Sequence, residues 1–260
     1  MEKKTLYFSQ IDPSKLSIVF TWDDNFERHA TSIGPIFKHF NKRCTFYINP
    51  GEPNFQSRLL GHYLRLSLNG FEIGSHGHTH HHYSKLSHRD FVYQLLESKA
   101  SIQTCLHIDP ITFAFPHHDY NAIMLKEAKQ IYFETRNTLN NSFRFGLKRD
   151  TNLNEIKDVI YDTLSSNKSL IFSGHSIQLQ NDNGFLDGYE PVHIRILVRA
   201  IKESNMYSEN AEICTFQQAA IKEYIKSNCL YNQKKFELLP AHIRELGQYG
   251  IKLKYLKKLV

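Results

Sequence analysis

Segments suited to buried strands alternate with segments suited to helices along most of this chain of 260 residues. Strand-like apolar runs lie near residues 16–22, 43–48, 71–75, 111–115, 131–135, 169–173 and 211–215. A helix-like segment follows each run, near residues 28–40, 55–67, 87–105, 120–130, 153–166, 192–205 and 215–227. Strands that alternate with helices in this way form parallel sheets, whose strands are buried on both faces. The sequence therefore predicts an α/β fold with a parallel sheet, and its length suffices for one large domain.

Polar side chains follow two of the predicted strands. The run Leu16–Trp22 ends in two adjacent carboxylates, Asp23 and Asp24. The run Phe71–Ser75 is followed by a cluster of histidines, namely His76, His78, His80, His81 and His82. Active sites of α/β folds gather at the carboxyl ends of strands, so we expect one edge of the sheet to hold carboxylate and imidazole groups together.

Two histidine pairings are compatible with a metal site. His76 and His80 are four residues apart and share one face of a helical turn. If the segment stays extended, His76, His78 and His80 share a face instead. Three protein ligands and one water are typical of a catalytic zinc site, so a carboxylate with two of these imidazoles would suffice.

The motifs around both clusters resemble one family. Thr21-Trp22-Asp23-Asp24 resembles the first motif of the polysaccharide deacetylases with a NodB homology domain, usually Thr-Phe-Asp-Asp-Gly. The segment Ser75–His80 resembles their second motif, in which Ser or Asn precedes a His, three further residues and another His. Lys42–Ile48 resembles the family's second strand, and the resemblance covers roughly residues 14–220. It implies an irregular seven-stranded (β/α) barrel of the NodB homology, or glycoside hydrolase-deacetylase, type.

The resemblance also implies roles for the two clusters. Asp24, His76 and His80 would hold one divalent metal ion, with Zn²⁺ as the first choice and Co²⁺ or Ni²⁺ as alternatives. Asp23 would be the general base, and neighbouring residues on a strand point in opposite directions, which suits such a division of labour. Asn25 stands where the family usually has glycine, and asparagine tolerates a left-handed backbone there.

Two later segments resemble further motifs of the family. The run Leu170–Ser176 contains His175 at a strand end, as in a late Leu-His motif whose histidine protonates the leaving amine. The run Ile111–Asn121 contains Pro116 and His117 and resembles the third motif, in which the backbone N–H of His117 would be an oxyanion donor.

One expected arginine is missing from this third motif. The better-known branch of the family carries an arginine before the proline, whereas Ala114 stands near that position here. Arg136 and Arg149, which lie later in the chain, are candidates to orient Asp23, and Arg149 is also a candidate for substrate binding.

The resemblance implies a metal-dependent hydrolase that removes acetyl groups from N-acetylated or O-acetylated sugars or polysaccharides. It would act on carbon–nitrogen amide bonds other than peptide bonds. Three other functions stay open: an amidase of the same fold acting on a small non-sugar amide, a non-catalytic glycan-binding relative, and a histidine patch that binds metal without turnover. The glycan-binding alternative is disfavoured because the five residues with expected roles are all present, Asp23, Asp24, His76, His80 and His175.

Composition argues against several other classes of protein. The formal net charge is +6, but no zinc-finger or RNP motif accompanies it, so we expect no nucleic-acid partner. No segment approaches the ~20 apolar residues of a membrane span. The N-terminus lacks the apolar core of a signal peptide, and the four cysteines form no CxxC, so we expect a cytoplasmic protein with free thiols.

The chain divides into two predicted parts. Residues 1–228 form the deacetylase-like domain, and residues 229–260 form a basic helical extension packed on or appended to the barrel. Its last segment, residues 251–260, is basic and amphipathic, and a helix docked on the barrel is favoured over a membrane-surface or partner helix. The segment 180–191 is rich in turn residues and predicts a loop over the site.

Overall fold

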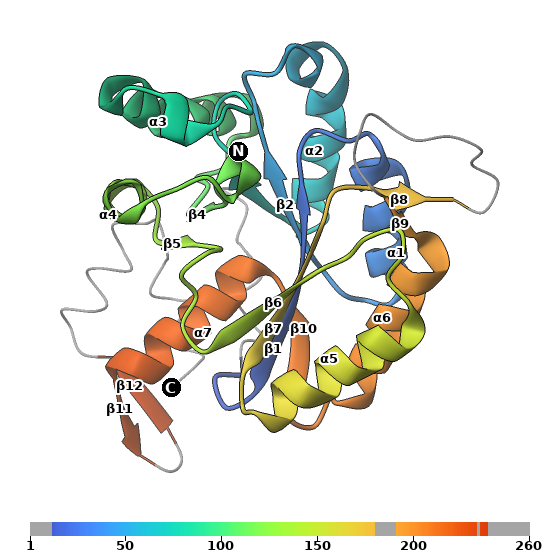
Figure 1. Cartoon of the computed structure of the whole chain (residues 1–260). Coiled ribbons are helices and arrows are strands. Elements are labelled where there is room, and N and C mark those ends of the chain that lie inside the picture. The colour runs from blue at the N-terminus through green and yellow to red at the C-terminus, as the bar shows by residue number, and fades with distance from the viewer. Residues whose placement is uncertain (1–11, 180–190, 233–234, 239–260) are drawn as a thin grey trace.

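A computed structural model describes residues 12–179, 191–232 and 235–238. Its centre is one parallel sheet in the order β5-β4-β3-β2-β1-β7-β6, with β10 pairing separately with β1. The sheet curls into a half-barrel with helices around it, so the predicted irregular (β/α) barrel is confirmed, with seven strands in this order and β10 as an eighth (Figure 1). The sheet strands are β1 Leu16–Asp23, β2 Thr45–Ile48, β3 Glu72–Ser75, β4 Thr112–Phe113, β5 Glu134–Thr135, β6 Ser142–Gly146, β7 Ser169–Gly174 and β10 Ala211–Cys214.

Helices occupy the connections between the strands. The α-helices are α1 Gly34–His39, α2 Leu60–Leu68, α3 His88–Leu106, α4 Ala122–Ile131, α5 Leu153–Ser165, α6 Ile194–Met206 and α7 Phe216–Asn228. Short helical turns are η1 His29–Ile33, η2 Phe55–Leu59, η3 Tyr83–Lys85 and η4 Pro116–His118. In the described parts of the chain, no helix is long and apolar enough to cross a membrane.

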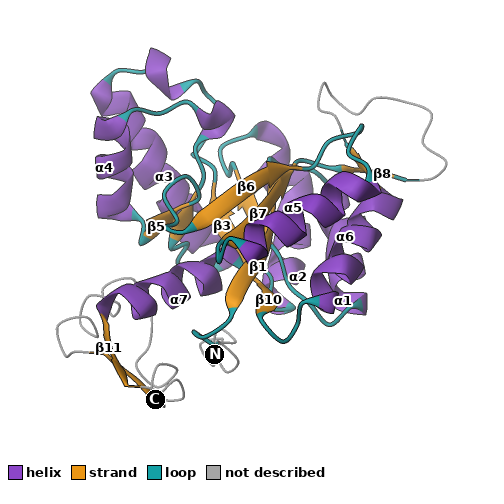
Figure 2. Cartoon of the chain, turned by 60° about the horizontal axis from the view of Figure 1, so that its bottom comes forward, coloured by secondary structure: helices purple, strands orange, loops and turns teal. Residues whose placement is uncertain are grey.

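The two faces of the sheet bury different partners. Successive strand residues point to opposite faces, so Phe20 and Phe172, whose rings stack at 4.7 Å, belong to the large outer core that includes side chains of α1, α2, α5 and α6. Val19 and Ile171 point to the inner face and pack with Phe216 at the start of α7. Figure 2 shows α5 and α6 on one side of the sheet and α7 on the other.

A buried carboxylate fixes α7 to the amino ends of the strands. Glu72, at the start of β3, accepts hydrogen bonds from the hydroxyls of Thr45 (2.8 Å) and Thr112 (2.5 Å). It also accepts the N–H of Gln217 in the first turn of α7 (2.7 Å), where the helix dipole favours a negative charge. Because α7 covers this end of the half-barrel, the opposite edge, at the carboxyl ends of the strands, is left for the site.

Several elements differ from the sequence prediction. β6 was not expected, because Ser142–Gly146 alternates polar and aromatic residues at a half-exposed edge and lacks a continuous apolar run. The predicted helix 192–205 begins instead with β9 (Val192–His193), which pairs with β8 (Ile177–Gln178).

The C-terminal part begins differently from the expected helical extension. β11 (Cys229–Asn232) and β12 (Lys235–Leu238) pair as antiparallel strands. The segments 180–190 and 239–260 lie outside the described residues, so the loop over the site and the terminal helices stay predictions. Among the cysteines, Cys44 and Cys214 are free and buried as expected, and Cys105 is free and half-buried.

Candidate active site

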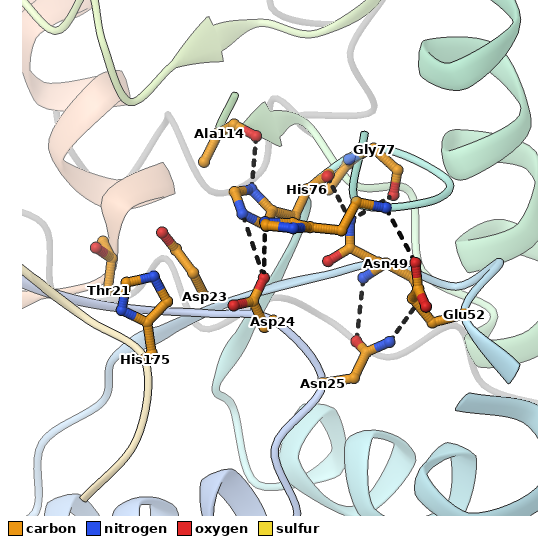
Figure 3. A network of polar contacts seen from close by, with 12 residues as sticks. Thr21, Asp23, Asp24, Asn25, Asn49, Glu52, His76, Gly77, Ala114 and His175 are labelled. Carbon is orange, nitrogen blue, oxygen red and sulfur yellow. Dashed lines mark hydrogen bonds and ion pairs between the residues drawn. The ribbon is translucent and has the colours of Figure 1, made fainter. Parts of the chain in front are cut away.

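Strand-end loops bring the two polar clusters of the sequence to one edge of the sheet (Figure 3). The parallel ladder continues past the strand ends, because the N–H of His76 donates to the carbonyl of Ile48 (2.8 Å). On the other side, the N–H of Ala114 donates to the carbonyl of Ser75 (2.9 Å). The loops after β2, β3 and β4 are therefore held in register beside the end of β1.

Asp24, His76 and His80 form a compact group of candidate metal ligands. The Oδ1 atom of Asp24 lies 3.1 Å from Nε2 of His80 and 3.6 Å from Nε2 of His76. One ligand atom from each residue lies within 4.8 Å of the other two, and the side chains are 13%, 2% and 18% exposed for Asp24, His76 and His80. Of the two histidine pairings open from the sequence, this geometry matches the pair His76 and His80.

The donor set fits a divalent metal ion. Nδ1 of His76 lies 2.8 Å from the carbonyl oxygen of Ala114, which can only accept, so Nδ1 carries the proton and Nε2 presents a lone pair toward Asp24. Burial lowers the pKa of His76 to about 3 and lowers that of His80 as well, so both rings are neutral near pH 7. Two neutral imidazoles and one carboxylate match the ligands of catalytic zinc sites.

The end of β1 turns in a way that the sequence did not predict. The left-handed residue is Asp24 (φ 69°), one position before the Asn25 that we expected to carry this conformation. This turn breaks the strand alternation, so both Asp23 and Asp24 face the site (Figure 3). Asn25 instead bridges to β2: its amide donates to the carbonyl of Asn49 (2.7 Å) and its oxygen accepts the N–H of Asn49 (3.1 Å).

Two further side chains hold the histidine loop. The amide of Asn49 donates to the carbonyl of His76 (2.5 Å), which links the loop after β3 to the Asn25 bridge. Glu52 accepts the backbone N–H of His80 at 3.0 Å. Neither role was predicted from the sequence, where both residues stand in an ordinary turn after β2.

Asp23 forms a buried ion pair with Arg136. Nη1 and Nη2 of Arg136 donate to Oδ1 and Oδ2 of Asp23 at 2.5 and 2.6 Å, and Nη1 also donates to the hydroxyl of Thr21 at 3.1 Å. The guanidinium also lies over the ring of Tyr47, 5.2 Å from its centroid. Burial by itself would raise the pKa of Asp23, but the charge and hydrogen bonds of Arg136, together with His76, hold that pKa well below its ordinary value.

Arg136 therefore occupies the role that the third-motif arginine was expected to fill. Arg136 directly follows β5, and its backbone N–H donates to the carbonyl of Phe113 at 2.8 Å. It therefore lies one strand beyond Ala114, which directly follows β4. Of the two candidates from the sequence, Arg136 orients Asp23. Arg149 is exposed in the turn after β6, and its substrate-binding role stays a prediction.

Replacing Arg136 by leucine is expected to lower the free energy of unfolding by about 3–5 kcal/mol, because it leaves a buried carboxylate without its partner. Removing the partner also lets burial raise the pKa of Asp23 above its unfolded value. The deficit should then be largest above this raised pKa, and it should shrink as pH falls through it and the carboxyl becomes protonated. Urea unfolding at pH 7 and pH 3.5 would measure both effects.

A double variant provides the control for this experiment. Asp23→Ala with Arg136→Leu removes both charges and should be more stable at pH 7 than Arg136→Leu alone, because no charge is then buried unpaired. A double variant that is less stable than the single variant would show that Arg136 acts through packing on Tyr47 and not through the ion pair.

His175 and the His117 turn complete the site. His175 follows β7 and lies beside Asp23 and Thr21 (Figure 3). Pro116 is buried at the start of η4, and the following His117 has a left-handed backbone (φ 54°). The His117 ring lies 4.2 Å from that of His80 and stacks on that of His82 at 3.8 Å, so this turn borders the metal-ligand cluster.

Residues 10–135, just under half of the chain, match the model of the polysaccharide deacetylase family. This part of the chain is therefore similar to the polysaccharide deacetylases. The match includes Asp23, Asp24, His76 and His80, so the resemblance carried by the first two motifs is confirmed. The name of the family specifies deacetylation, which for an N-acetyl group is the hydrolysis of an amide bond. A comparison with curated protein sequences gives no match.

Solved structures of deacetylases share the fold. The Xyl-CE4 domain of a multidomain xylanase from the hindgut metagenome of Trinervitermes trinervoides aligns with a TM-score of 0.58 and 16% identity, over 85% of this chain and 96% of that one. The chitin deacetylase of Colletotrichum lindemuthianum aligns with a TM-score of 0.60 and 15% identity, over 79% and 88%. A CE4 family pseudoenzyme from Bacillus anthracis aligns with a TM-score of 0.55 and 14% identity, over 80% and 66%. At these identities the likeness concerns the fold, and activity must be argued from the site.

Proposed function

We propose that this protein is a metal-dependent hydrolase that removes acetyl groups from N-acetylated sugars. The supporting observation is the juxtaposition of the ligand cluster Asp24, His76 and His80 with the carboxylate of Asp23, which Arg136 holds at both oxygens. Hydrolysis needs both a bound metal ion and a separate, oriented carboxylate that can act as a base. A protein that only stores metal does not need this second carboxylate.

A divalent ion held by Asp24, His76 and His80 would supply the positive charge that polarises the acetyl carbonyl and makes the attacking water more acidic. Asp23 accepts the proton from that water, and Arg136 fixes the carboxylate so that one geometry is presented to it. The lowered pKa keeps Asp23 ionised near pH 7. The backbone N–H of His117 donates to the oxygen that gains negative charge. His175 then gives a proton to the departing amine, and acetate leaves.

Acetate release tests this function. Purified protein loaded with Zn²⁺ or Co²⁺ is incubated with chitooligosaccharides, with O-acetylated xylan and with small non-sugar amides such as acetanilide. We expect release from the N-acetylated sugars and its loss with a chelator. Release from the small amides alone would favour the amidase, and metal binding without release from any substrate would favour a non-catalytic relative.

His175→Ala should separate amide from ester substrates. An amine is a poor leaving group that needs a proton, whereas the leaving group of an activated aryl acetate does not. The variant is therefore expected to lose ~10²-fold or more in kcat/KM on the N-acetyl substrate and less than ~10-fold on the aryl acetate, with its metal content unchanged. Equal losses of kcat/KM on both substrates would show that His175 is not the general acid and that it positions the substrate instead.

A further inference from the structure

His29 is a buried histidine that the proposed mechanism does not use. It is the first residue of η1 and is fully buried, with its ring 4.9 Å from that of Phe46. Its ring contacts two groups that lead to the site. Nε2 lies 2.7 Å from the carbonyl oxygen of His175, and Nδ1 lies 2.9 Å from the hydroxyl of Tyr63. The hydroxyl of Tyr63 is in turn 3.2 Å from the carbonyl oxygen of Asp24.

The partners fix the protonation of this ring. The carbonyl of His175 can only accept, so Nε2 of His29 carries a proton. Burial lowers the pKa of His29 to about 4, so the ring is neutral near pH 7 and Nδ1 has a lone pair. This lone pair and the carbonyl oxygen of Asp24 are alternative acceptors for the one hydroxyl proton of Tyr63. A chain of contacts thus runs from the backbone of Asp24 through Tyr63 and His29 to the backbone of His175.

The backbone around His175 shows why this contact matters. Next to it, the carbonyl of Ser173 accepts the N–H of Leu147 at 2.7 Å, and that of Ser176 accepts the N–H of Val192 at 3.1 Å. At His175, between the end of β7 and the start of β8, the carbonyl accepts instead from the side chain of His29. The His175 side chain projects from the backbone beside this peptide unit, so a donor to its carbonyl restrains the backbone that carries the imidazole.

We propose that His29 is a positioning residue, which holds the His175 backbone so that its imidazole faces the leaving group. This inference rests on the proposed role of His175 as the proton donor. A histidine that only stabilised the fold would act through its whole ring. The positioning role instead depends on one nitrogen, Nε2, which donates to the carbonyl of His175.

Two amide variants separate the two nitrogens. In His29→Gln the side-chain NH₂ reaches the position of Nε2 and can donate to the carbonyl of His175. In His29→Asn the shorter amide reaches only the position of Nδ1, so it can accept from Tyr63 but leaves the carbonyl of His175 without this donor. The readouts are thermal stability, zinc content and the ratio of kcat/KM on an N-acetyl sugar to that on an aryl acetate.

His29→Asn is expected to lower the amide-to-ester ratio at least ~10-fold, since a misplacement of about 1 Å can cost ~10²-fold in rate. His29→Gln is expected to keep this ratio within ~3-fold of wild type, and zinc content should be unchanged in both. In a His175→Ala background, His29→Asn should change the ratio no further. A ratio that falls equally in both variants, or that stays at the wild-type value in His29→Asn, would overturn the inference.

Crystal structures of both variants keep this test separate from the proposed function. If the wild-type protein hydrolyses no amide, the proposed function is wrong. The positioning role of His29 can still be tested, because the crystal structures show directly whether His175 has moved. A displaced His175 in His29→Asn together with an undisturbed His175 in His29→Gln supports it. An unmoved His175 in His29→Asn overturns it.

Discussion

Replacing His80 by alanine is expected to abolish both metal binding and acetate release. His80 supplies one of three ligand atoms, and its Nε2 lies 3.1 Å from Oδ1 of Asp24. Loss of a partner that only orients a ligand typically costs 10–100-fold in metal affinity, so loss of a ligand itself should cost more than ~100-fold. Zinc affinity by competition with a chromophoric chelator and acetate release on the same samples would measure the two effects.

His82→Ala is the matched control for this change. His82 comes from the same histidine-rich loop, but its side chain is 48% exposed and its Nδ1 lies 3.7 Å from a different carboxylate, that of Asp119. It stacks on His117, so its loss removes one ring contact at the rim and no metal ligand. We expect most of the metal affinity and turnover to remain. Full zinc occupancy in His80→Ala, or equal losses in the two variants, would refute the ligand assignment.

Replacing Asp23 by asparagine is expected to lower kcat on N-acetyl sugars by ~10²–10⁴-fold, the usual contribution of a general base. Asparagine keeps the shape but cannot accept the proton in the same way. Because the pKa of Asp23 is lowered by Arg136, wild-type Asp23 stays ionised at all near-neutral pH values, so the ratio of wild-type to variant rates should be nearly constant between pH 6 and pH 8.

The Asp23 variant also loses the charge that balances Arg136, so its free energy of unfolding is expected to fall. Its zinc content should nevertheless equal that of wild type, whereas Asp24→Asn should lose zinc. Circular dichroism and metal analysis on the assayed samples would distinguish a catalytic loss from unfolding. A metal-free Asp23→Asn with a metal-loaded Asp24→Asn would mean that the roles of the two aspartates are reversed.

The sequence predicted those parts of the site whose residues directly follow a recognisable strand. β1 is a mostly apolar run and β3 is a short buried strand, and polar residues follow directly at the end of each. Parallel strands end at one edge of a sheet, so the proximity of Asp24, His76 and His80 could be predicted. The sequence could not show that Arg136, and not Arg149, pairs with Asp23. Which of the two reaches Asp23 depends on how the sheet curls, and curling is a property of all its strands together.

The supporting contacts were missed for a related reason. Asn25 with Asn49, and His29 with Tyr63 and His175, join residues that are separated by at least 24 positions in the chain. A lone histidine at the start of a helical segment gives no sign that its ring will donate to a carbonyl 146 positions later. β6 escaped prediction because an alternating, half-exposed edge strand lacks the apolar run that identified its neighbours.

The proposed function depends on a single metal ion bound at the ends of β1 and β3. Crystals grown with Zn²⁺ and measured on both sides of the zinc absorption edge would locate it directly by anomalous diffraction. We expect one strong anomalous peak within about 2.0–2.2 Å of a carboxylate oxygen of Asp24 and of Nε2 of both His76 and His80, the usual zinc–ligand distances. No peak there, or a peak held instead by the rim histidines His82 and His117, would contradict it.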